Sequence, residues 1–140
     1  MRRRIAAAIS ATALILPTAG TLAAAPKRKV VTEWKQAPGT AVQADRWGEI
    51  QVVLVVRKRT TTIGQKKTVT RRITGVRLPI WPKDGGAHTV NLNKQVIPQL
   101  AQQVLQGQFK TRIDVISEAT DTSEAFSKSL QVALLNARRV

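Results

Sequence analysis

The chain has 140 residues and a net charge of +15, with 23 Lys and Arg against 8 Asp and Glu. It contains no cysteine, which excludes disulfides, thiolate metal sites and cysteine nucleophiles, and its length allows one domain with a modest core. The excess of positive charge favours anionic partners, such as a membrane surface, a cell-wall polymer, nucleic acid or a phosphate ligand.

The pattern of residues 1–25 predicts an export signal. Arg2 to Arg4 form a positively charged start, Ile5 to Leu16 is a mostly apolar run, and Ala23 to Ala25 is a small-residue cleavage region. An uncleaved anchor is the alternative, because the 21 residues from Ile5 to Ala25 are just enough to span a bilayer. Both interpretations place the rest of the chain outside the cytoplasm.

Residues 26–39 are expected to form a basic polar linker, whose charge would hold it near anionic lipid headgroups. The domain proper is expected over residues 40–140. It would begin with a short strand over 41–45. Ile50 to Val56 follows as the strongest strand, and its apolar residues on both faces are typical of a central strand.

The run from Arg57 to Arg72 carries seven positive charges and is expected to be the tip of a hairpin. Such a run is most often a solvated tip. The functional alternative is contact with a phosphate polymer or anionic lipid. No aromatic residues are interleaved with the charges, which argues against binding of single-stranded nucleic acid. The next strand is expected over 69–81, with Pro79 placing it at a sheet edge or a bulge.

Two helices are expected in the second half of the chain. Asn91 or Asn93 could also cap a helix that begins near Leu92 and that Pro98 interrupts. Pro98 fits better as the opening of a helix that runs to about Gln106 and ends at Gly107. A strand from Arg112 to Ile116 would follow, and then a last helix. That helix is predicted by residues that form one apolar face at the helical period: Phe126, Leu130, Ala133, Leu134 and Ala137. The order β-β-β-α-β-α indicates an α+β domain with a largely antiparallel sheet and two or three helices.

The segment between the strand and the last helix is a candidate phosphate site. Four residues that favour an N-cap, from Thr120 to Ser123, stand just ahead of the helical pattern. The start of a helix offers unpaired N–H groups and a partial positive charge. A phosphate is the ligand that such a turn would accept.

The residues around this turn resemble those of the bacterial FMN-binding domain. The similarity lies in Asp114-x-x-Ser117-x-Ala119-Thr120, then Thr122-Ser123 and Ser129-Leu130-Gln131-x-Ala133-Leu134. It extends to Arg46-Trp47-Gly48-x-Ile50-Gln51-Val52, Ile73-Thr74-x-Val76 and Val96-Ile97-Pro98-x-Leu100, so it covers roughly residues 40–137. That domain occurs in small exported proteins and in the C and G subunits of sodium-pumping and Rnf-type redox complexes.

The resemblance implies a role for each residue of the motif. The threonine matching Thr120 carries FMN through a phosphoester that a separate flavin transferase makes. Asp114, Ser117 and Ala119 would belong to the motif that this enzyme reads, and Thr122 and Ser123 would be candidates to hydrogen-bond the phosphate. Such a domain is an electron carrier with a membrane redox partner rather than a stand-alone enzyme, because the flavin carries the chemistry.

The sequence departs from the family pattern at two positions. Glu118 stands where the family has glycine, and Asp121 follows the threonine. At about 5 Å each carboxylate would repel a phosphate charge by roughly 1 to 3 kcal/mol, depending on the effective dielectric. Covalent flavin, non-covalent flavin or another ligand, and a flavin-free turn in which Asp121 favours the helix dipole all stay open. The last of these leaves a basic module that binds anionic membrane or cell-wall polymers.

The remaining candidate residues have ordinary explanations. His88 is the only histidine, so a zinc site or a Ser–His–Asp triad is not expected. Trp34, Trp47 and Trp81 are expected to anchor the core or the linker, and one of them could flank a flavin ring.

Overall fold

The computed structural model describes residues 26–140, so the export signal predicted over residues 1–25 lies outside the described part. Contacts between Cα atoms divide the described chain into two units. One comprises residues 26–30 and 61–68, and the other comprises residues 31–60 and 69–140. Within residues 26–140, none of the helices has the length and apolar character needed to cross a bilayer.

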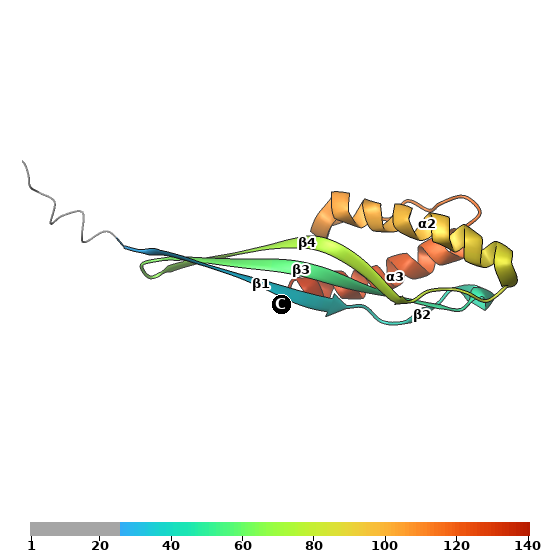
Figure 1. Ribbon diagram of the computed structural model, residues 1–140, viewed down its shortest axis with the longest axis horizontal. Helices are drawn as coiled ribbons and strands as arrows, with labels where there is room; N and C mark the ends of the chain where they lie inside the picture. Colours follow the sequence, from blue (N-terminus) through green and yellow to red (C-terminus); the bar gives the residue numbers. More distant parts are fainter. Residues whose placement is uncertain (1–25) are drawn as a thin grey trace, which may run out of the picture. The chain divides into compact units, whose positions relative to one another are not determined.

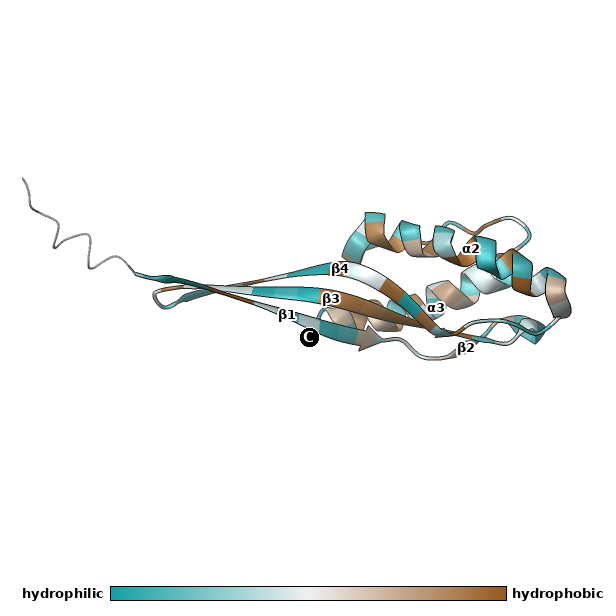
Figure 2. Cartoon of the chain, in the orientation of Figure 1, coloured by the Kyte–Doolittle hydropathy of each residue, from teal (hydrophilic) through white to brown (hydrophobic). Residues whose placement is uncertain are grey.

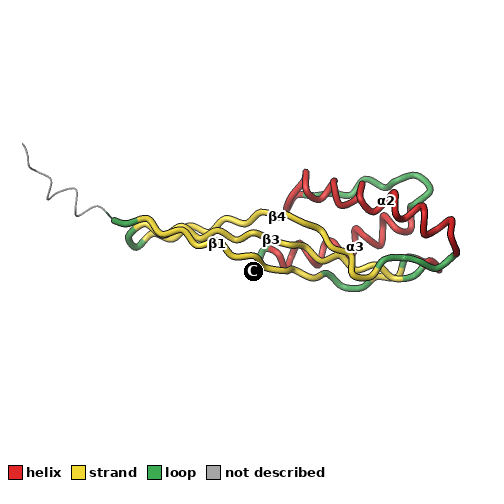
Figure 3. Tube along the Cα trace, in the orientation of Figure 1, coloured by secondary structure: helices red, strands yellow, loops and turns green. Residues whose placement is uncertain are grey.

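A four-stranded sheet is built around β3 (Figures 1 and 3). Its strands are β1 (Arg28–Pro38), β2 (Val42–Gln43), β3 (Glu49–Ile63) and β4 (Lys66–Ile80), and the other three all pair with β3. The pairing of β2 with β3 is antiparallel, with Val42 opposite Ile50. The predicted central strand is therefore confirmed.

Two α-helices complete an α+β fold, as predicted. They are α2 (Gly86–Gly107) and α3 (Thr120–Ala137), and short 3-10 turns occupy Asp45–Trp47 and Gln108–Lys110. The predicted hairpin is also present, but β3 and β4 continue through most of the basic run, and the turn is confined to Gly64 and Gln65.

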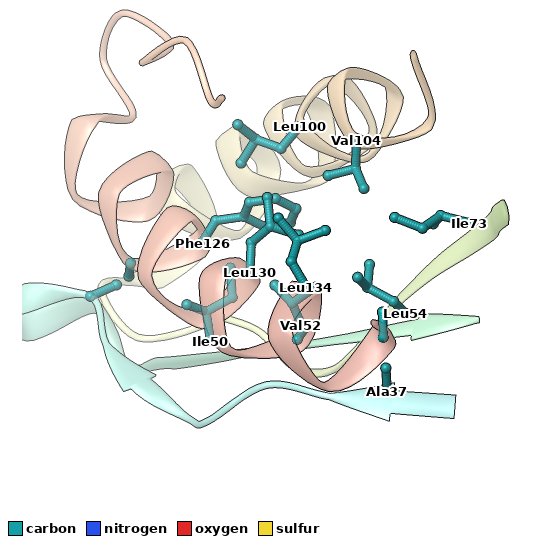
Figure 4. Packing of buried hydrophobic residues seen from close by; sticks show 14 of the residues in the cluster. Ala37, Ile50, Val52, Leu54, Ile73, Leu100, Val104, Phe126, Leu130 and Leu134 are labelled. Carbon is teal, nitrogen blue, oxygen red and sulfur yellow. The ribbon is translucent and has the colours of Figure 1, made fainter. Parts of the chain in front are cut away.

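The core lies between the helices and β3 (Figure 4). On α3, every member of the predicted apolar face is buried. Phe126 and Leu130 lie between Leu100 of α2 and the β3 side chains in Figure 4. β3 contributes Ile50, Val52, Leu54 and Val56, each fully buried. The same strand turns hydrophilic from Arg57 onward (Figure 2).

The predicted linker was wrong for most of its length, because Arg28–Pro38 forms β1. Polar and charged side chains suggest a linker, but a strand needs only backbone groups to pair with an available edge. The edge of β3 supplies those groups, since β1 and β3 are hydrogen-bonded neighbours in the sheet. Just after β1, the Gly39 N–H also donates to the Val52 carbonyl oxygen at 2.7 Å. Ala37 is fully buried, so the folded domain begins before residue 40.

The predicted strand from Arg112 to Ile116 was also wrong, since residues 111–116 have no regular structure. Side chains take the place of a neighbouring strand. The Asp114 N–H donates to Oε1 of Gln103 at 2.8 Å, and Nε2 of Gln103 donates to the Asp114 carbonyl oxygen at 3.3 Å. The Ile116 N–H donates to Oγ of Ser123 at 3.2 Å. The element order is consequently β-β-β-β-α-α.

The prediction that Pro98 opens a helix was wrong, because Pro98 lies inside α2. A proline inside a helix removes one backbone hydrogen bond. Pro98 is exposed, whereas Val96, Leu100 and Val104 are buried along the same helix. Burial of these side chains holds the helix together across the missing bond, because packing contributes more to helix stability than propensity does.

The free edge of β4 is covered at one residue by a side chain. The Ile73 N–H donates to Oε1 of Gln108 at 2.7 Å, and Nε2 of Gln108 donates to the Ile73 carbonyl oxygen at 3.0 Å. The Gln108 amide therefore pairs with Ile73 as a residue of a fifth strand would.

Candidate functional site

The turn before α3 leaves the start of that helix without a side-chain cap. The N-cap residue is Ala119, which makes no side-chain hydrogen bond, so the prediction of a cap among residues 120–123 was wrong. Oγ of Ser123 instead donates to the Ala119 carbonyl oxygen at 2.7 Å. An α-helix leaves its first N–H groups without partners inside the helix. The side chain of Ala119 has no acceptor atom, so it cannot cap the N–H groups of Thr120 and Asp121.

Glu118 adopts a left-handed backbone conformation, with φ of 67°. The turn closes when the Ala119 N–H donates to the Ile116 carbonyl oxygen at 3.0 Å. Glycine enters this conformation freely, whereas other L-residues lose roughly 1–2 kcal/mol there. Glu118 therefore retains the backbone path that a glycine would favour, at a cost in stability. Its side chain is exposed.

A cavity of about 390 Å³ lies at this end of α3. Its volume falls in the range of small-molecule sites. Trp47 comes from the 3-10 turn that precedes β3, His88 and Leu92 come from the first turns of α2, and Thr120 and Asp121 begin α3. Thr120 is exposed and is one of the residues that line the cavity. The other lining residues are Thr89, Asn93, Glu118, Ala119 and Thr122.

Asp121 is held by the tryptophan across the cavity. Nε1 of Trp47 donates to Oδ2 of Asp121 at 3.1 Å, and the Arg46 guanidinium lies 4.7 Å from the centre of the Trp47 ring. An indole N–H partly compensates the carboxylate charge by hydrogen bonding to it. Of the three tryptophans, Trp47 is the one that lines this cavity. Trp34 is 61% exposed, and Trp81 lines a separate hollow.

The hydroxyls of Thr122 and Ser123 are engaged inside the protein. Oγ1 of Thr122 donates to Oδ1 of Asn93 at 3.0 Å, and Nδ2 of Asn93 donates to the Pro82 carbonyl oxygen at 3.1 Å. Thr122, Ser123 and Asn93 are all nearly fully buried. These bonds fix α3 to α2 and to the turn. The sequence suggested Asn93 only as a possible helix cap, which was wrong, because Asn93 lies inside α2. A single polar residue in a helix gives no sign that it is buried.

The structure separates the motif residues into two groups. Ala119, Thr120 and Thr122 line the cavity, whereas Asp114, Ser117 and Ser123 do not. Of the second group, Asp114 and Ser117 are exposed and Ser123 is buried. His88 also lines the cavity, but within residues 26–140 no group of three His, Asp or Glu side chains is arranged to hold a metal ion.

Gly85 supports the Trp47 wall, and its replacement gives a testable prediction. It has φ of 96°, and a Cβ there would lie 2.5 Å from the Trp47 ring and 2.7 Å from Oγ1 of Thr89. We expect Gly85→Ala to lower the free energy of unfolding by about 1–3 kcal/mol and to change Trp47 fluorescence. Urea denaturation measures the first effect. Gly86→Ala is a matched control for the clash, because φ is 85° there and a Cβ would meet nothing within 4 Å. Equal losses in the two variants would contradict the contact with Trp47.

Thr120 and Asp121 at the start of α3 therefore lie around one cavity with the Trp47 ring and Leu92. The chain matches no protein-family model, and no curated protein matches it significantly.

Proposed function

We propose that this chain is an FMN-binding electron carrier that works outside the cytoplasm, with the flavin attached through a phosphoester to Thr120. The observation that supports this most is the exposure of Thr120 as the first residue of a helix without a side-chain cap, beside a 390 Å³ cavity. A phosphate is favoured at such a helix start.

The residues around the cavity fit both ends of FMN. The amides at the start of α3 would hold the phosphate oxygens, and Oγ1 of Thr120 would provide the ester oxygen. Trp47 and Leu92 provide apolar surface for the ring system. Bound FMN would supply the transfer of electrons, while the chain binds it and fixes its orientation.

Two carboxylates line the cavity, and each is compensated in a different way. Asp121 accepts a hydrogen bond from the Trp47 indole. Glu118 is exposed to solvent, which screens its charge. The positive end of the α3 dipole acts on both. The repulsion of a phosphate is therefore weaker than the bare charges suggest.

The exposure of Asp114 and Ser117 supports their proposed role in recognition. A flavin transferase must reach the motif from solvent, and these side chains are accessible without any movement of the core. The electron-transfer partner would be a membrane redox protein, in keeping with the export signal predicted for residues 1–25.

Co-expression with a bacterial flavin transferase tests the proposal. We expect the exported protein to retain visible flavin absorbance after denaturation and precipitation, at about one flavin per chain. Protein made without the transferase should be colourless. A second FMN-binding domain that the transferase is known to modify serves as the positive control. Colourless protein beside a labelled control would contradict the covalent assignment.

Restoring glycine at position 118 gives a second prediction. We expect Glu118→Gly to raise the free energy of unfolding by about 1 kcal/mol, because glycine adopts positive φ without strain. It should also raise the flavin content after limited reaction with the transferase. Glu118→Ala separates the two causes, since it removes the charge and keeps the Cβ. If neither stability nor labelling differs between the glycine and alanine variants, backbone strain at this position has no role.

A further inference from the structure

Two segments meet at the turn between β3 and β4, and we call them the hairpin end. They are residues 26–30, which include the start of β1, and residues 61–68, which include the turn. Figure 3 shows the turn as a loop beside the segment that leads into β1. The two segments approach closely, because a Cβ at Gly64 would lie 3.4 Å from Cβ of Pro26.

The hairpin end is densely cationic. Its two segments contain no Asp or Glu, and all of its basic residues are exposed: Lys27, Arg28, Lys29, Lys66 and Lys67. With no acidic residue within the two segments, the positive charges reinforce one another as a target for anions.

Exposed aliphatic side chains lie among these charges. Val30 is 41% exposed and Ile63 is 44% exposed, and Pro26 is also exposed. Interfacial membrane-binding elements combine basic residues with apolar ones, because the cations meet anionic headgroups while the apolar groups enter the boundary with the acyl chains.

We propose that the hairpin end docks on an anionic lipid bilayer, with its five cations on the headgroups and with Val30 and Ile63 entering the interface. A soluble polyanion would satisfy the charges but would offer no apolar layer to Val30 and Ile63. The chain also enters this surface at Pro26, shortly after the apolar run from Ile5 to Leu16. The proposal does not depend on flavin, so the two can fail separately.

The absence of cysteine allows one probe to be placed on the full chain. Gln65→Cys at the turn is labelled with an environment-sensitive fluorophore and mixed with vesicles of phosphatidylglycerol and phosphatidylcholine, or of phosphatidylcholine alone. We expect a blue shift and quenching by lipid-bound quenchers only with phosphatidylglycerol. Salt at 1 M should remove the change, since the screening length falls to about 3 Å. Gln102→Cys is the control, because the hollow that it lines contains no charged residue. This comparison works whether or not residues 1–25 hold the chain on the vesicle.

Variants then identify the groups responsible. The triple change Lys29→Gln, Lys66→Gln and Lys67→Gln should weaken the response of the Gln65 probe roughly a hundredfold in lipid concentration, since each surface cation contributes about fivefold. Lys94→Gln, Lys110→Gln and Lys128→Gln together remove the same charge elsewhere and should leave the response nearly unchanged. Ile63→Ser should weaken it without any change in charge.

Three results would overturn the proposal. Equal effects of the two triple variants would show that the hairpin end is not the surface that binds the vesicle. An equal response to vesicles of phosphatidylcholine alone would show that the negative charge of the headgroups has no role in binding. Polyphosphate that reproduces the full probe response, together with no effect of Ile63→Ser, would assign the surface to a phosphate polymer instead of a bilayer. Circular dichroism of each variant verifies that the fold is retained.

Discussion

Thr120→Ala should abolish covalent flavin completely, because a phosphoester requires a side-chain hydroxyl at the attachment position. Thr120 is exposed and lies at the start of α3, so its loss leaves the core unchanged. We expect the free energy of unfolding to change by less than about 0.5 kcal/mol, as is usual for surface positions. The loss of flavin would therefore not be an effect of misfolding.

Thr120→Ser is the matched control, since it keeps the hydroxyl and removes only a methyl group. We expect this variant to retain measurable flavin after denaturation, with slower attachment. Mass spectrometry of the peptide that spans residues 113–128 locates the adduct. An alanine variant that keeps covalent flavin on this peptide would show that another residue carries it.

Phe126→Ala should destabilise the protein by about 3–5 kcal/mol, the usual cost of removing a buried phenyl ring. Phe126 is fully buried and lies between α2 and the sheet (Figure 4). Its removal deprives both layers of contact and leaves a cavity. Since small domains are stable by only about 5–15 kcal/mol, this loss is a large part of the total.

Urea denaturation of the purified variants measures this effect. Leu135→Ala on the same helix is the control, because Leu135 is 52% exposed and its truncation should cost less than about 0.5 kcal/mol. A similar loss in both variants would mean that α3 does not present the Phe126 face to the core.

The elements that the sequence predicted are those whose pattern is local. The apolar residues of α3 recur at the helical period, and β3 contains a continuous apolar run. Each element can therefore be predicted without knowledge of the element that it packs against. β1 and residues 111–116 were misread because their structure is decided by the groups that pair with their backbone, and the pattern within each segment does not show those partners. The edge of β3 makes a strand of a polar segment, and Gln103 satisfies the backbone of Asp114 in place of a strand.

The site was predictable only in part for the same reason. Thr120 follows from its motif and from its place before a helical pattern. The bond between Trp47 and Asp121 joins residues 74 positions apart, and the bond between Asn93 and Thr122 joins residues 29 apart. Neither spacing leaves a signal in one sequence. The positive φ of Glu118 is likewise visible only in the folded chain.

The Gln108 amide on the rim of the sheet has a consequence for self-association. Exposed strand rims recruit strands from other molecules, and such recruitment is the first step toward fibrils. At Ile73 both backbone groups are already occupied. An incoming strand must displace a glutamine before it can add to β4 at this residue, which gives a very basic chain a local safeguard against polymerisation.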